Sequence, residues 1–66
     1  MGRGRLVTFE NVEATAHTDL ALLCIIEGEE VWVPHSQIDD DSEVFEKGTS
    51  GDLIVTRWWA EKKDLV

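Results

Sequence analysis

The sequence predicts a mainly β fold, a small antiparallel SH3-like or OB-like barrel of four to five strands with one short C-terminal helix. Three observations lead to this prediction. The run from Leu20 to Ile26 is apolar at every position, as in a strand buried on both faces. A tight turn follows, because Gly28 can adopt the positive φ that a hairpin requires. The chain then returns from Val31 to Val33 and stops at Pro34, which has no N–H to donate to a neighbouring strand.

The first strand is predicted from Arg5 to Thr15, where apolar and polar residues mostly alternate. One face of this strand is therefore expected to contact water. We expect one domain over residues 1–66, in which residues 1–4 form a flexible arm. A domain this small buries only about 60% of the surface of its unfolded chain. Since Cys24 is the only cysteine, no internal disulfide can add support, and we expect a homo-oligomer.

The sequence after the hairpin predicts a short helical turn, followed by a short apolar segment that contacts the core. Ser36 can cap the turn, with the following aspartates near its start, where the backbone dipole favours negative charge. Val44 and Phe45 are expected to make the apolar contact.

A last strand and a helix complete the predicted fold. The glycine-containing turn from Lys47 to Gly51 precedes a strand from Asp52 to Thr56. Thr56 is a suitable N-cap residue for a helix from Arg57 to Asp64, because its hydroxyl can accept from an unpaired N–H of the first turn. Four or five short antiparallel strands with one C-terminal helix are most like a small SH3-like or OB-like barrel.

Acidic residues dominate the charge of the chain. Fourteen acidic against six basic residues give a formal charge of −8. Phosphate backbones are bound by clustered Lys and Arg, so direct binding of nucleic acid is disfavoured and a basic protein surface is the better partner. The alternative is that the charge serves solubility only. The candidate partner-binding residues fall within eight positions: Asp39, Asp40, Asp41, Glu43 and Glu46.

No set of residues in the chain predicts catalysis. His17 and His35 have acids nearby, but no ligand spacing typical of a metal site recurs, and solvated turn residues are the better interpretation. Cys24 lies in an apolar strand, which raises the pKa of a thiol and hides the sulfur, so core packing is favoured over a nucleophile. We therefore predict a protein that is not an enzyme, with no catalytic residue, no metal and no cofactor.

Three tryptophans, Trp32, Trp58 and Trp59, are a large aromatic content for so short a chain. They could stack the bases of a single strand. A stacking platform normally accompanies a basic groove, however, and Trp32 is framed by Glu29 and Glu30. Anchors in the core or in a subunit interface are the favoured interpretation, with one Trp covering the open end of the barrel.

Five short sequence patterns follow one another along the chain in an order that resembles a known group of proteins. These are Gly-Glu-Glu-Val-Trp-Val-Pro, Ser-Gln-Ile, Asp-Ser-Glu-Val, Gly-Asp-Leu-Ile-Val and Trp-Trp-Ala-Glu-Lys-Lys. In this order they resemble a group of small acidic proteins encoded by bacteriophages and prophages, largely of unassigned function. The likeness covers Ala14 to Leu65 and departs from the pattern at His35, where a lysine is expected, and at Trp59, where a smaller apolar residue is expected. It implies a phage-associated origin and action by binding host machinery, and it carries no known active site.

The leading hypothesis is a non-enzymatic, phage-type binding protein whose acidic edge engages a basic surface on a host nucleic-acid-handling or defence complex. Inhibitors of the anti-CRISPR class are one example. One alternative is a single-stranded nucleic-acid-binding module that uses the tryptophans with Arg3, Arg5 and Arg57. Another is a structural subunit that self-assembles through strand edges. Because no apolar run approaches the about 20 residues of a membrane span, we expect no membrane partner. The lone thiol, Cys24, fits a reducing compartment, so we expect a cytoplasmic location, in the host cell if the protein is phage-encoded.

Overall fold

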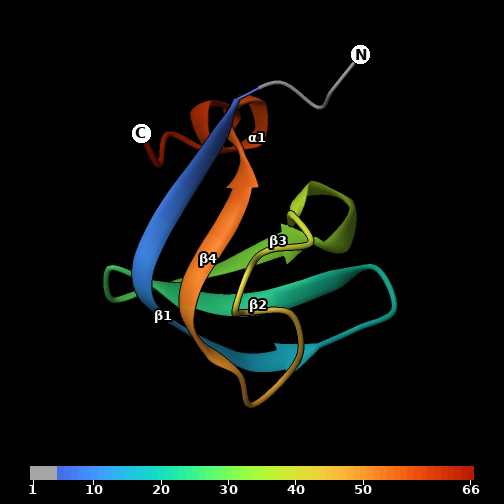
Figure 1. Cartoon of the computed structure of the whole chain (residues 1–66). Helices are drawn as coiled ribbons and strands as arrows, with labels where there is room; N and C mark the ends of the chain where they lie inside the picture. The colour runs from blue at the N-terminus through green and yellow to red at the C-terminus, as the bar shows by residue number, and fades with distance from the viewer. Residues whose placement is uncertain (1–4) are drawn as a thin grey trace.

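The computed structural model describes residues 5–66 and confirms a mainly β fold. Four antiparallel strands form one sheet in the order β3-β2-β1-β4, and a short helix, α1, follows the last strand (Figure 1). The strands are β1 (Leu6–His17), β2 (Ala21–Ile26), β3 (Glu29–Pro34) and β4 (Ser50–Thr56). The flexible arm predicted over residues 1–4 lies outside the described residues.

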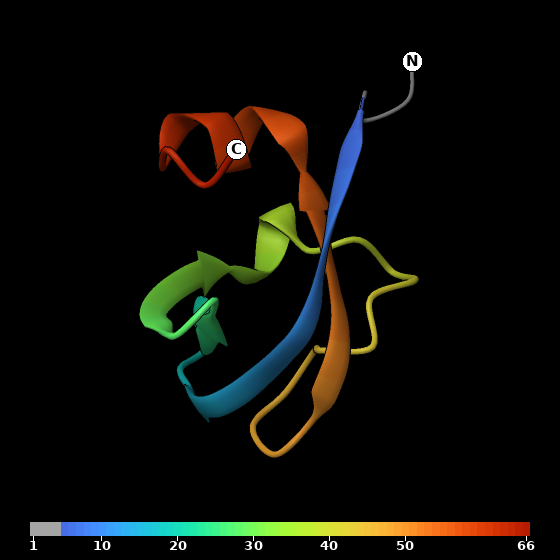
Figure 2. The ribbon, with the colours of Figure 1, turned by 90° about the vertical axis from the view of Figure 1, so that its left-hand side faces the viewer.

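β1 is a long, bent strand that belongs to both halves of the sheet. Its register with β4 shifts between Phe9 and Val12, and Asn11 between them has a φ of 59°, a left-handed conformation that Asn tolerates. A second shift, against β2, falls between Ala14 and Ala16. Irregularities of this kind bend a strand and increase its twist. The first half of β1 therefore lies beside β4 and the second half beside β2, in two layers that Figure 2 shows edge-on.

The hydrophobic core lies between these two layers. The buried apolar residues are Phe9, Val12, Ala14, Leu22, Cys24, Ile26, Val33, Val44, Leu53, Val55, Trp59 and Ala60. The predicted packing of Cys24 is confirmed, since its side chain is fully buried in this cluster. The radius of gyration of 10.6 Å agrees with the about 11 Å expected for a compact chain of this length.

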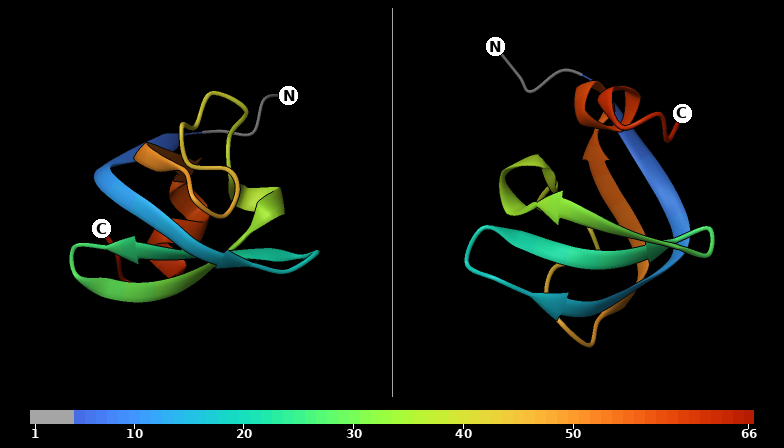
Figure 3. Two further views of the ribbon diagram at one scale, coloured as in Figure 1. Left: turned by 90° about the horizontal axis from the view of Figure 1, so that it is seen from below. Right: turned by 180° about the vertical axis from the view of Figure 1, so that it is seen from behind.

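Burial on both faces of the apolar hairpin strand was expected and is not observed. Leu22, Cys24 and Ile26 point into the core, whereas the alternate residues of β2 are only half-buried. Leu20, which precedes the strand, is 81% exposed. The physical reason is the two-layer arrangement, in which the opposite layer covers one face of β2 only (Figure 3).

The helical turn after β3 is present, but its predicted cap is wrong. A 3-10 turn, η1 (His35–Gln37), begins directly after Pro34, which occupies the N-cap position and provides no side-chain cap. Ser36 lies inside the turn because proline, with φ near −60°, already places the next residue in position to start it. The aspartates follow the end of η1 rather than lying near its start.

The helix α1 (Arg57–Lys62) confirms the predicted N-cap. Thr56 Oγ1 accepts a hydrogen bond of 3.3 Å from Trp59 N and donates one to Gln37 Oε1, which ties η1 to the start of the helix. α1 ends two residues earlier than predicted, since Lys63 is the C-cap and Asp64 has a φ of 59°. The helix lies at one end of the two layers (Figures 1 and 3), and Trp59 packs from it into the core.

Candidate acidic binding surface

The acidic segment, Asp39–Glu46, lies along the outer edge of β4. An isolated antiparallel bridge between Ile38 and Val55 directly precedes the segment. Asp39 N then donates to Ile54 O over 2.8 Å, and Glu43 N donates to Asp52 O over 2.8 Å. β4 pairs with β1 on its other side, so this segment occupies what would otherwise be an open sheet edge.

Two side chains of the acidic segment replace the backbone groups of a further strand. Ser42 Oγ accepts from Ile54 N over 3.2 Å and donates to Val44 O over 2.8 Å. Glu43 Oε1 accepts from Asp52 N over 2.9 Å. The outward N–H groups of β4 at these two positions are thereby satisfied, and the segment is held in one conformation.

Ser42 is the residue that sequence reasoning missed. It is 7% exposed and lies in the middle of a run of acids. A small hydroxyl residue next to aspartates is typical of side-chain turns, in which the hydroxyl bonds a backbone group one or two residues away. That signal could have marked Ser42 as the anchor of the segment.

Thr49 holds the second half of the acidic segment. Its hydroxyl donates to Glu46 O over 2.6 Å and accepts from Phe45 N over 3.1 Å. Gly48 N also donates to Ala14 O over 2.9 Å, which attaches the turn to β1. Of the two residues predicted to contact the core, Val44 is fully buried, but Phe45 is 55% exposed. The prediction is therefore wrong for Phe45, whose side chain lies at the surface while its neighbour Val44 fills the core.

The five predicted binding residues divide into two kinds. Asp39 is partly buried, and its Oδ2 accepts from Asp41 N over 3.0 Å. Glu43 bonds β4, as described above. The carboxylates of the other three acids are exposed and form no hydrogen bond or ion pair with another residue of the range 5–66; they are Asp40, Asp41 and Glu46. Three carboxylates of the segment thus lie at the surface, while the carboxylates of Asp39 and Glu43 form hydrogen bonds that help to hold the segment in place.

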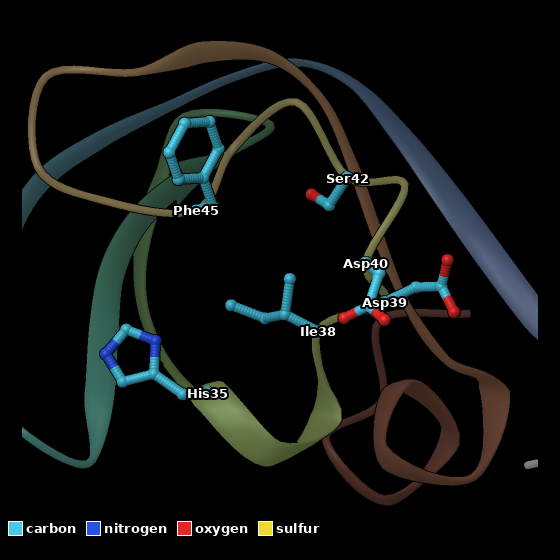
Figure 4. A pocket seen from close by; sticks show the side chains of 6 residues that line it. All are labelled: His35, Ile38, Asp39, Asp40, Ser42 and Phe45. Carbon is cyan, nitrogen blue, oxygen red and sulfur yellow. The ribbon is translucent and has the colours of Figure 1, made fainter.

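A cavity of about 410 Å³ opens beside the acidic segment (Figure 4). Its lining comes from η1, the acidic segment and the bridge between them: His35, Ile38, Asp39, Asp40, Ser42 and Phe45. His35 Nε2 lies 3.1 Å from Thr18 O. Because a carbonyl oxygen only accepts, Nε2 carries the hydrogen of this contact.

The three tryptophans do not share one environment. Trp59 is 3% exposed and belongs to the core, whereas Trp32 and Trp58 are 48% and 62% exposed. The core alternative is therefore wrong for Trp32 and Trp58, and their role as interface anchors stays a prediction. Trp32 lies opposite Leu23 on the half-buried face of the hairpin. Lys62 Nζ lies 5.1 Å from the centroid of the Trp58 ring.

Basic residues gather at the helix end of the molecule. Arg57 N donates to Arg5 O over 2.9 Å, which places the start of β1 beside the start of α1. Arg57 also pairs with Glu61 over 2.8 Å, and Lys62 and Lys63 follow on the same helix and its cap. Arg3, named with Arg5 for the nucleic-acid alternative, lies outside the described residues.

The remaining chemistry of the described chain is sparse. Burial raises the pKa of the Cys24 thiol from 9.0 to about 11. No group of three or more His, Cys, Asp or Glu in the range 5–66 could hold a metal ion. Among the same residues, no helix is long and apolar enough to cross a membrane. In comparisons with known proteins, no family model, no curated protein and no solved structure matches this chain.

Proposed function

We propose that this protein is a non-enzymatic binding protein whose acidic segment engages a basic surface on another protein. The observation that carries the proposal is the presentation of three exposed carboxylates, Asp40, Asp41 and Glu46, by a segment hydrogen-bonded along β4. A segment already held in one conformation loses little entropy on binding. Exposed carboxylates of one sign attract a basic surface and repel an acidic one.

The resemblance to small acidic phage proteins supports a more specific form of this proposal. The protein is then of phage type, acts in the cytoplasm of the host, and binds a host nucleic-acid-handling or defence complex, as an inhibitor of the anti-CRISPR class would. Such complexes bind nucleic acid through clustered Lys and Arg. A protein with a formal charge of −8 complements that kind of surface.

A purely structural role is the main competitor for the acidic segment. Charged residues along a sheet edge prevent that edge from pairing with another chain. Such a role requires only charge at the edge. A binding role requires these particular carboxylates, which makes the two distinguishable by substitution.

The first expected result concerns a triple variant, Asp40→Asn, Asp41→Asn and Glu46→Gln. It should bind its partner at least about tenfold more weakly than the wild type, because lost charge pairs at an interface reduce affinity and association rate. Folding should change by no more than about 0.5 kcal/mol, since none of the three side chains bonds another described residue. Capture from a bacterial lysate, identification by mass spectrometry and calorimetry on the purified partner provide the measurement.

The matched control removes the same charge from the β2–β3 turn through Glu27→Gln, Glu29→Gln and Glu30→Gln. Figure 2 shows this turn on the side of the molecule away from the acidic segment. The control variant should keep its affinity for the partner. Only part of the salt dependence of that affinity should be lost. Equal losses in both variants would mean that net charge alone matters, and an unchanged affinity in the triple variant would refute the proposal.

A second candidate function has one observation in its favour. Trp58 is exposed beside the basic residues of α1, which is the environment that base stacking requires. Lys62 already covers one face of the ring, however, and the charge of the whole chain opposes a phosphate backbone. Quenching of wild-type fluorescence by an oligothymidine, lost in Trp58→Ala, would favour this function over the acidic surface.

We also propose that the protein self-associates through the outer face of β2 and β3, where Trp32 lies opposite Leu23. A large exposed aromatic side chain such as Trp32 is a typical anchor of a subunit interface. Light scattering at micromolar concentration should give the mass of a dimer or a larger species. Trp32→Ser should shift that mass to the monomer, whereas Trp58→Ser should not. A monomeric wild type over the whole concentration range would contradict the prediction.

A further inference from the structure

We propose that the cavity beside the acidic segment is a binding pocket for an arginine side chain of the partner. The guanidinium group would pair with Asp40, and the apolar stem would pack on Ile38 and Phe45. This inference rests on the proposed function and narrows it, because it replaces a general basic surface by one inserted residue.

The walls of the cavity differ in chemistry, and each wall suits a different part of an arginine side chain. Figure 4 shows Phe45 and His35 on one side of Ile38, and the carboxylates of Asp39 and Asp40 on the other. The apolar stem of an arginine can pack on Ile38 while its head reaches the carboxylate side. The exposed ring of Phe45, on the other side of Ile38, extends the apolar surface on which the stem can pack.

The polar atoms around the cavity select a hydrogen-bond donor. Ionised Asp40 only accepts, and its carboxylate has no partner among residues 5–66. The Ser42 hydroxyl is committed to Val44 O and Ile54 N. A carboxylate repels an anion, whereas a planar cation with several N–H groups can pair with it through more than one hydrogen bond.

The pocket is preformed, since backbone bonds hold the residues on both sides of it. Asp39 N is bonded to Ile54 O, which places the carboxylate side against β4. Phe45 N is bonded to Thr49 Oγ1, which holds the ring at the opposite side. Binding would therefore require no folding of a loop, and the ligand meets a site of fixed shape.

The test uses N-acetyl-arginine methylamide as the probe, with nuclear magnetic resonance of the 15N-labelled full chain. We expect saturable shifts of the Ile38, Asp40 and Phe45 amides with a dissociation constant of about a millimolar, as for one small side chain. N-acetyl-citrulline methylamide has the same shape without the charge and should bind about tenfold more weakly. N-acetyl-lysine methylamide should also bind more weakly, because an ammonium lacks the planar face and the fork of donors.

Substitutions then separate the pocket from general electrostatics. Asp40→Asn and Phe45→Ala should each weaken probe binding by about tenfold, the first through the lost charge pair and the second through lost apolar contact. Glu29→Gln is the control, because it removes one negative charge from the β2–β3 turn, which does not line the cavity. It should leave the dissociation constant within about twofold. The amide spectrum of each variant reports whether it remains folded.

Several results would overturn the inference, and they differ from those that would overturn the proposed function. Equal binding of the citrulline or lysine probe, or equal losses in Asp40→Asn and Glu29→Gln, would show that no arginine-specific pocket exists. If the partner protein still depends on the three exposed acids but tolerates Phe45→Ala, the acidic surface stands and the pocket is refuted. If the arginine probe binds while the partner ignores the three acids, the proposed function is refuted, and with it the role of the pocket in binding the partner.

Discussion

Trp59→Ala is expected to unfold the protein at room temperature. Trp59 is 3% exposed and packs in the one hydrophobic core cluster of the described chain. Truncating a buried Trp to Ala costs about 3–5 kcal/mol through lost burial and the remaining cavity. A single core of this size supplies only about 3–5 kcal/mol of stability. Loss of the β signal in circular dichroism and of the cooperative urea transition are the measurements.

Trp58→Ala is the matched control, since it makes the same change one residue earlier in α1. Trp58 is 62% exposed, and the Lys62 ammonium lies 5.1 Å from its ring centroid. Loss of an exposed cation–π contact costs about 0.5–1 kcal/mol. Trp59→Phe should fall between the two, because Trp59 Nε1 is buried without a hydrogen-bond partner among residues 5–66 and the change gives up no such bond. Equal destabilisation by Trp58→Ala and Trp59→Ala would contradict the placement of Trp59 as the core residue.

Ser42→Ala is expected to have the next largest effect and to release the acidic segment from β4. The hydroxyl accepts from Val44 N and Ile54 N and donates to Val44 O. Its removal leaves these groups unpaired in a buried place, at a cost of about 1–3 kcal/mol. Urea unfolding gives the lost stability. Faster hydrogen exchange of the Ile54 amide shows whether the segment has left the strand.

Ser36→Ala is the control for this experiment. Ser36 is exposed in η1 and provides no cap, so its loss should change stability by no more than about 0.5 kcal/mol. Unchanged exchange at Ile54 in Ser42→Ala would contradict the anchoring role of the hydroxyl. Loss of partner binding in Ser42→Ala, with all acids still present, is expected because the exposed carboxylates would no longer be held together.

The sequence by itself determined the strands, the hairpin and the helix cap. Apolar residues in runs and alternations report which segments become strands, and this periodicity is a local property of the chain. Gly28, with a φ of 84°, forms the predicted turn, and Thr56 caps the predicted helix. Such signals are readable because turns and caps depend on residues at most a few positions apart.

The tertiary structure decided which of several similar residues are buried, which form hydrogen bonds and which are exposed. Trp58 and Trp59 are adjacent and identical in type, and only the direction of α1 on the two layers makes one buried and the other exposed. The aspartates and glutamates of the acidic segment likewise divide into braces and exposed groups because β4, a strand later in the chain, offers its open edge to Ser42 and Glu43. These outcomes depend on contacts between residues far apart in sequence, and no local pattern specifies them.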